Sequence, residues 1–456
     1  MKKPLSKLFG NERKNKTIAF AAAAAIVLTG AGLPAGAQYA AASADAAPAT
    51  ASEPLDPSFV AGGQLEQVSE LDLDTALSLA TGNSTNLLLL QLKYEALDAK
   101  QKDLSSQAED METTDTDPYF LPGSPGEIMS KYGITGDNPS DLLWLGPVTE
   151  NNKVTNQLMA GMVTMADGMN ELIASQRNQA EVAAKQMEND KWNTELDQAE
   201  AKEGIALKMT AQYAQLLAQR QQIALAEEYS AVLASDLSRA LKLQAAGLAS
   251  GDDIDDLKEA SAAQDEQLQT LRNNYLLGLA QLSFDLGIAY NPDLALKDIE
   301  FEVPAAAKRT DTETLLAASF EMKRLYNDIA QAEWEQKHTS TQNSAGRKYL
   351  AVNVEIARQQ AEQAKADLSK QIDAVYTSAD NAYLNYASKV RSGKEGLAEY
   401  EKMKLRYNGG FISKHDLTKY ELQLKQNDTE TAVAKLQAFV QTKQVEAMER
   451  GFIQLN

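Results

Sequence analysis

The chain has 456 residues, a formal net charge of −20 and no cysteine. The acidic balance argues against a nucleic-acid partner, because phosphate contacts need a basic face, and the lack of cysteine excludes a small disulfide scaffold. The sequence contains no Gly-rich dinucleotide motif, P-loop or Gly-x-Ser-x-Gly motif, and neither His338 nor His415 has a histidine or cysteine at metal-ligand spacing. We therefore expect no enzyme, no cofactor and no metal site.

Residues 1–37 have the pattern of a signal peptide. Basic residues precede the apolar stretch Thr17–Leu28, which is shorter than the roughly 20 residues of a membrane span, and Ala35-Gly36-Ala37 offers a cleavage pattern. Cleavage removes six basic residues and one acidic residue, which changes the net charge from −20 to −25. A retained anchor is the less favoured alternative. Residues 38–66, rich in Ala, Ser and Pro, are predicted to be a flexible leader.

Proline placement predicts two long helical regions. All 12 prolines lie at or before Pro147, or at Pro292 and Pro304, and a proline costs about 3 kcal/mol in a helix interior. We therefore expect a first helical repeat over 67–287 with an irregular insertion at 105–150. A linker over 288–310 and a second, shorter helical repeat over 311–456 follow.

Heptad spacing supports long helices that pack as coiled coils. Within the first repeat, one helix is predicted from about 155 to 245. A 4-3-4-3 spacing joins eight positions of the next helix: Leu257, Ser261, Gln264, Leu268, Leu271, Tyr275, Gly278 and Leu282. The earlier helix has the same spacing at Met209, Tyr213, Leu216, Arg220 and Ile223.

The two halves repeat the same turn motif. Four positions of the first half align with four of the second at an offset of 163: Gly247, Ser250, Asp253 and Ile254 with Gly410, Ser413, Asp416 and Leu417. The helix beginnings align at an offset of 238, through Leu77, Ala80, Leu87 and Glu95 with Leu315, Ala318, Leu325 and Glu333. The first half is therefore the longer by 75 residues.

Each motif predicts the tight tip of a helical hairpin. Gly247 and Gly410 are expected to end a helix in the left-handed conformation. Ser250 and Ser413 are expected to cap the next helix, with Asp253 and Asp416 completing capping boxes. We expect Leu248 and Phe411 to be trapped in the turn. The plainer interpretation is that the Gly, Ser and Asp residues only form the turn.

Duplicated hairpins with these tips resemble the TolC family of outer-membrane efflux proteins. The opening helix, Ala76-Leu77-Ser78-Leu79-Ala80-Thr81-Gly82-Asn83, is similar to the family's Ala-Leu-x-x-Ala-x-x-x-Asn. The resemblance covers about 71–105, 160–287 and 315–450. It implies an all-α fold of two unequal repeats of long antiparallel hairpins, of the TolC-like α-barrel type. It also implies a homo-oligomer, a trimer in the family, that forms a helical tunnel.

The resemblance assigns a docking role to the tips. In the family, the Gly-hydrophobic turns contact the periplasmic adaptor of an export system. By that resemblance the docking residues would be Gly247, Leu248, Ser250, Asp253, Gly410, Phe411, Ser413 and Asp416. Asp252, Asp255 and Asp256, beside Asp253, would form an acidic constriction. The alternative, which we favour, is an acidic first turn that complements the helix dipole.

The chain departs from the family where each repeat normally carries two amphipathic strands. The second half has only Lys337–Lys348 there, too short for two spanning strands of about 9–11 residues each. We therefore expect little or no β-structure in a divergent member. The predicted function is a conduit or docking component of an efflux system, in the outer membrane or elsewhere in the cell envelope or at the cell surface. The alternative is a non-conducting coiled-coil scaffold.

Overall fold

The computed structural model describes residues 66–115, 117–136, 139–304, 308–339 and 343–454. The predicted signal peptide, 1–37, and all but the last residue of the predicted leader, 38–66, lie outside the described residues.

The described chain is built almost entirely of helices, as predicted. The first half contains β1 (Glu70–Leu71), α1 (Leu73–Gly82), α2 (Thr85–Glu109), α3 (Pro125–Tyr132), a short 3-10 helix (Pro139–Leu142), α4 (Leu145–Ala245) and α5 (Gly251–Leu286). The second half contains β2 (Ala295–Leu296), α6 (Thr312–Ala318), α7 (Phe320–His338), α8 (Ser344–Asn408) and α9 (Lys414–Glu449). At 1.5 Å per residue, the 101 residues of α4 extend about 150 Å.

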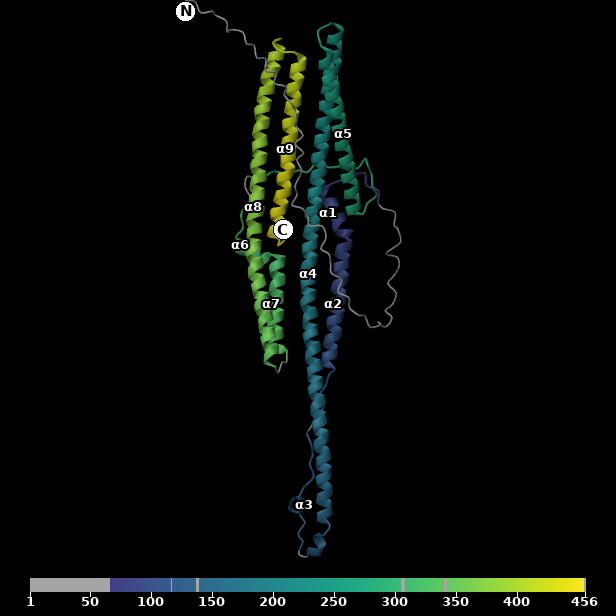
Figure 1. The fold of residues 1–456 in the computed structure, drawn as a ribbon, viewed down its shortest axis with the longest axis vertical. Helices are drawn as coiled ribbons and strands as arrows, with labels where there is room; N and C mark the ends of the chain where they lie inside the picture. Colours follow the sequence, from purple (N-terminus) through teal and green to yellow (C-terminus); the bar gives the residue numbers. More distant parts are fainter. Residues whose placement is uncertain (1–65, 116, 137–138, 305–307, 340–342, 455–456) are drawn as a thin grey trace, which may run out of the picture. The chain divides into compact units, whose positions relative to one another are not determined.

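The long helices pack as antiparallel neighbours (Figure 1). Along α4, α2 packs on the N-terminal part and α5 on the C-terminal part, and α8 packs in the same way against α7 and α9. Helices α7 and α9 also contact α4 and so join the two repeats. The short strands β1 and β2 pair in parallel, with Leu71 opposite Leu296, which fixes the linker to the start of the first repeat.

Each repeat opens with a short helix and a serine-capped break. Ser84 accepts a hydrogen bond from the amide of Leu87 and begins α2, and Ser319 accepts one from Met322 and begins α7. These serines satisfy amides that a helix start leaves without partners. The sequence predicted the opening helices without these breaks.

Each repeat has its own hydrophobic core, and a third cluster joins them. The first core is centred on Tyr213, Leu279 and Leu282, and the second on Leu368, Ile372 and Tyr376. The third places Phe320, Ala447 and Phe452 of the second repeat against Leu196, Ala199 and Leu207 of α4. The repeats therefore share a packed interface at mid-length of α4.

The predicted heptad seam lies between α4 and α5. Leu268 and Leu282 are buried, and so is Gln264, whose side-chain amide donates to the carbonyl of Ala226 at 3.1 Å. Gly278 faces Leu216 so closely that a Cβ atom would lie 2.7 Å from the leucine Cδ2. The small and polar seam positions thus let the two helices approach closely.

The helix α4 begins at Leu145, ten residues before the predicted start near 155, and α2 continues to Glu109. The irregular segment is therefore shorter than 105–150 at both ends. Pro147 accounts for the earlier start of α4. It lies in the first turn of that helix, where an amide donor is not needed and proline is tolerated.

No helix in the described part of the chain is both long enough and apolar enough to cross a membrane.

Candidate docking site at the hairpin tips

The tip between α4 and α5 closes through a Schellman motif. Gly247 has φ = 71°, a left-handed conformation that glycine adopts at little cost. Its amide donates to the carbonyl of Gln244 at 2.8 Å, and the amide of Leu248 donates to Leu243 at 2.8 Å. These two bonds satisfy carbonyls that the end of α4 would otherwise leave without partners.

The tip between α8 and α9 has the same geometry. Gly410 has φ = 75°. Its amide donates to Tyr407 at 2.9 Å, and the amide of Phe411 donates to Arg406 at 2.8 Å. The predicted role of both glycines in ending a helix is confirmed.

Both tips continue into a capping box, also as predicted. The amide of Asp253 donates to the Ser250 hydroxyl at 3.1 Å, and the amide of Ser250 donates back to the carboxylate at 3.2 Å. Ser413 and Asp416 repeat both distances. Hydrogen bonds from the serine side chains, and then from the serine amides, lower the pKa of Asp253 and Asp416. The ionised carboxylates are therefore part of the tip structure.

The expectation that Leu248 and Phe411 are trapped in the turn is wrong. Their exposed fractions are 75% and 83%. The space between the helices is filled instead by Ile254 and Leu417, which follow the caps by four residues and are buried. A hydrophobic residue at this fourth position was the available sequence signal. Each tip therefore presents a large apolar side chain to solvent.

His415, expected to be a solvated turn residue, lies between the two hairpins. Its Nδ1 is 2.9 Å from Oδ1 of Asp236 on α4, and both side chains are less than a quarter exposed. Lys425 of α9 and Glu228 of α4 form an ion pair between the same helices. These pairs connect the tip regions of the two repeats. The sequence held no signal for them, because their partners are far apart in the chain.

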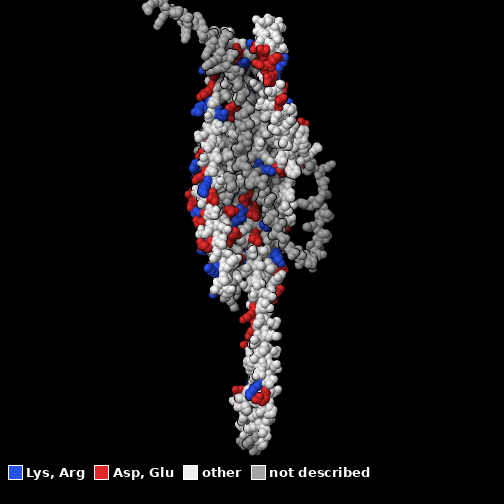
Figure 2. Space-filling model, in the orientation of Figure 1, with Lys and Arg blue, Asp and Glu red and all other residues white. Residues whose placement is uncertain are grey.

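The predicted acidic group lies on the first turns of α5 and is exposed. Asp252, Asp255 and Asp256 all face solvent, and Asp255 pairs with Lys258 at 2.9 Å. Figure 2 shows this acidic group just beside the uncharged end of the hairpin. Among the described residues, no group of His, Cys, Asp and Glu has an arrangement that could hold a metal ion.

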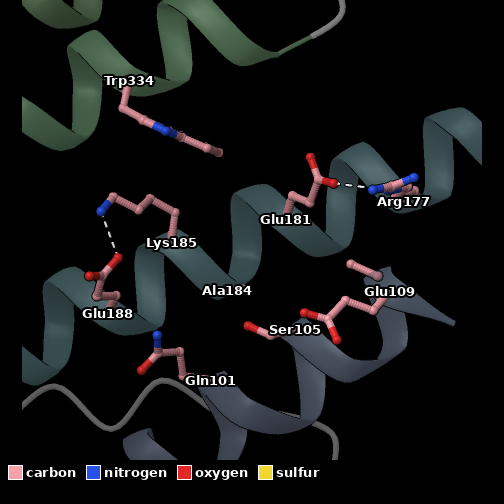
Figure 3. A pocket seen from close by; sticks show the side chains of 10 residues that line it. Gln101, Ser105, Glu109, Arg177, Glu181, Ala184, Lys185, Glu188 and Trp334 are labelled. Carbon is pink, nitrogen blue, oxygen red and sulfur yellow. Dashed lines mark hydrogen bonds and ion pairs between the residues drawn. The ribbon is translucent and has the colours of Figure 1, made fainter. Parts of the chain in front are cut away.

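Away from the tips, a concave region lies where α2, α4 and α7 meet (Figure 3). The charged side chains that α4 contributes form two ion pairs along the helix, Arg177 with Glu181 at 3.0 Å and Lys185 with Glu188 at 2.6 Å. Trp334 of α7 covers one side. Ser105 and Glu109 of α2 also line this region.

The fold is similar to that of solved outer-membrane proteins. VceC of Vibrio cholerae matches with a TM-score of 0.50 and 12% identity over 83% of this chain and 96% of VceC. The CmeC outer-membrane channel of Campylobacter jejuni matches with a TM-score of 0.51 and 12% identity over 84% of this chain and 86% of CmeC. The outer-membrane channel OprN matches with a TM-score of 0.50 and 13% identity, over 83% and 90%.

Sequence comparison adds no relative. No family model matches the sequence, and no curated protein matches it in sequence. The proteins of similar fold are channels rather than enzymes. The chain has the TolC-like helical-hairpin fold of these outer-membrane channels.

Proposed function

We propose that this chain is a cell-envelope component of an efflux or export system and contacts an adaptor protein through its two hairpin tips. Several copies, three by resemblance, assemble through their helices into a conduit. The exposed carboxylates of Asp252, Asp255 and Asp256 lie on the first turns of α5, where they complement the helix dipole. The outer membrane is the proposed location, by analogy with the channels that share the fold.

The observation that carries the proposal is the pair of matching tips. Both end in a glycine with positive φ, and both continue into a capping box with the same bond lengths. Each displays one large apolar side chain, Leu248 or Phe411. An apolar side chain on a rigid turn is a suitable anchor for a pocket on another protein, because little conformational freedom is lost on binding.

The test replaces the two anchors in the full chain. Leu248→Ser with Phe411→Ser should leave the helix content unchanged, because both side chains are exposed. Export of a fluorescent dye, from host cells that lack the native copy, should fall at least tenfold. Copurification of the host's adaptor proteins should fall with it.

The chain offers a matched control in α5. Leu277 and Phe284 are exposed to 70% and 81%, almost the same as the two anchors, but lie away from the tips. Leu277→Ser with Phe284→Ser should export dye at the wild-type rate. Wild-type export by the tip variant, or equal losses in both variants, would reject the docking role.

A further inference from the structure

The N-terminal part of α4, residues 145–173, lies beyond the helices that accompany the rest of it. The neighbouring helix α2 ends at Glu109, and α7 ends at His338, whose carbonyl accepts a hydrogen bond from Asn178 of α4. Past this level the described residues of 110–115 and 117–136, which include α3, run along α4. The packing on this stretch therefore differs from that on the rest of the helix.

One face of the stretch is covered by the chain's own segment. The side-chain amide of Asn152 donates to the carbonyl of Pro122 at 2.9 Å. Asn156 exchanges two hydrogen bonds with the backbone of Leu121, and Asn170 exchanges two with the backbone of Thr114. These asparagines bind the irregular segment along a single stripe of α4.

A second stripe is rotated from the asparagine stripe by about 100° around the helix. It consists of Val148, Thr155, Leu158, Met162, Met165, Met169 and Leu172. From Leu158 to Leu172 the spacing is 4-3-4-3, and these five side chains are exposed to between 56% and 69%. This apolar stripe, called here the methionine stripe, extends about 36 Å from Val148 to Leu172 at 1.5 Å per residue.

We propose that the methionine stripe packs against the same stripe of other copies of this chain, parallel and in register. The 4-3-4-3 spacing from Leu158 to Leu172 covers two heptads and is the pattern of a coiled-coil seam. The stripe contains no charged residue, so parallel copies bring no like charges together across it. Methionine side chains adapt their shape to a facing surface, which suits a seam between identical helices.

The chemistry of the stretch favours a second copy over lipid. Helices that lie on a membrane have a broad apolar face and a polar face rich in Lys and Arg, whereas a stripe limited to seam positions is narrow. Residues 145–173 contain a single basic residue, Lys153, against Glu150, Asp167 and Glu171. The apolar stripe is therefore narrow and its surroundings are acidic.

The area of the methionine stripe is too small to form a stable interface by itself. With a width of about 10 Å, it offers roughly 360 Å² per copy, less than half of the roughly 800 Å² that each partner buries in a stable interface. The stripe thus adds to contacts made elsewhere between copies. In this respect the inference rests on the proposed oligomeric conduit and specifies where its subunits meet.

Single cysteines test the contact directly, because the chain has none of its own. In the full chain, Met165→Cys should form a covalent dimer with a short bis-maleimide in high yield. Asp167→Cys is the control, since it is exposed on the opposite face of the same turn, and should give little dimer. Leu158→Cys and Leu172→Cys should each crosslink to themselves, whereas an antiparallel seam would crosslink them only to each other.

A matched pair of double variants tests the apolar character of the contact. Met162→Glu with Met169→Glu places two charges on the stripe, and Gln157→Glu with Thr164→Glu places two at the same seven-residue spacing off it. Combined with Leu158→Cys, the first pair should lower crosslinking at least fivefold, and the second should leave it unchanged. Both pairs replace exposed residues, so the helix content should not change.

The outcomes separate this inference from the proposed function. Light scattering that reports an oligomer, with no crosslink through Met165, would reject the stripe contact and leave the conduit standing. A monomer under all conditions would reject both. Flotation with phosphatidylethanolamine–phosphatidylglycerol vesicles that the stripe glutamates abolish, with no crosslink through Met165, would identify lipid as the occupant and overturn the inference.

Discussion

Asp253 and Asp416 are the residues at which the charge state and the local fold of the tips are directly coupled. Each carboxylate accepts hydrogen bonds from the hydroxyl and the amide of its serine. A protonated carboxyl group accepts such bonds more weakly, which is why these bonds lower the pKa of both aspartates. The start of α5 and of α9 is therefore expected to respond to acid.

The sign of the response follows from the lowered pKa values. An unfolded aspartate has a pKa of about 3.9, so the capping boxes contribute their full stability above that value and lose it as the pH falls through the lower folded value. Amide protection over residues 251–256, corrected for intrinsic exchange rates, should fall several-fold on acidification. Asp253→Asn should show weaker protection at neutral pH and no such acid loss. An equal acid loss in that variant would contradict the prediction.

At the residue scale the sequence predicted what local chemistry determines. The glycines, serines and aspartates of the tips form their bonds within six residues of each other, so their spacing was sufficient. His415 was not predictable, because its partner, Asp236, comes from another helix of the other repeat. The exposure of Leu248 was missed for a related reason, since burial depends on which helices surround the turn.

At the scale of single helices, α8 depends on one buried face. Leu368 is fully buried in the second core, whereas Leu384 of the same helix is exposed. Leu368→Ala should lower the free energy of unfolding by about 2–5 kcal/mol, because it leaves a cavity. Leu384→Ala should change it by less than about 0.5 kcal/mol. Urea unfolding followed by far-UV circular dichroism measures both, and similar losses in the two variants would contradict this account of the core.

The existence of the long helices was predictable, but not all their limits. Proline-free composition and heptad spacing indicated α4 and α5 together with the seam between them. The start of α4 was placed too late, because Pro147 was interpreted as a break and instead lies in the first turn. The pairing of β1 with β2 was also missed, since two-residue strands leave no periodic pattern.

At the scale of the whole described chain, Arg324 of α7 forms ion pairs with α4 and so contributes to the contact between the two repeats. Burial by itself would lower its pKa, but hydrogen bonds to Glu200 and Glu321 raise it above its ordinary value. Its guanidinium also contacts Asp197 at 2.9 Å, and its side chain is only 20% exposed. One cation of α7 thus forms ion pairs with two carboxylates of α4 and with one of its own helix.

Removing this cation should weaken the contact between the two repeats and lower the free energy of unfolding. Arg324→Ala should cost about 1.5–3 kcal/mol, the range for hydrogen bonds to charged groups, because three carboxylates then repel each other. Arg309 provides the control, since its ion pair with Asp380 is largely exposed, and Arg309→Ala should cost less than about 1 kcal/mol. Thermal unfolding of both variants distinguishes them, and equal midpoints would refute a special role for Arg324.

The duplicated fold was predictable from the repeated tips and helix beginnings, and the similar channel structures agree with it. The joint between the repeats was not predictable. Arg324 lies more than 120 residues from Asp197 and Glu200, and no local pattern connects positions so far apart.

The two tips share a backbone but carry different charges, and this has a consequence for symmetry. The helix after the first tip begins Gly-Asp-Asp-Ile-Asp-Asp, and the helix after the second begins Lys-His-Asp-Leu-Thr-Lys. In a ring of n copies, turn shape would recur 2n times per revolution, but the sign of the charge only n times. A partner that senses shape alone could then dock in twice as many rotational positions as one that also senses charge. The different charges of the two tips would therefore determine in which rotational positions the partner binds to the ring.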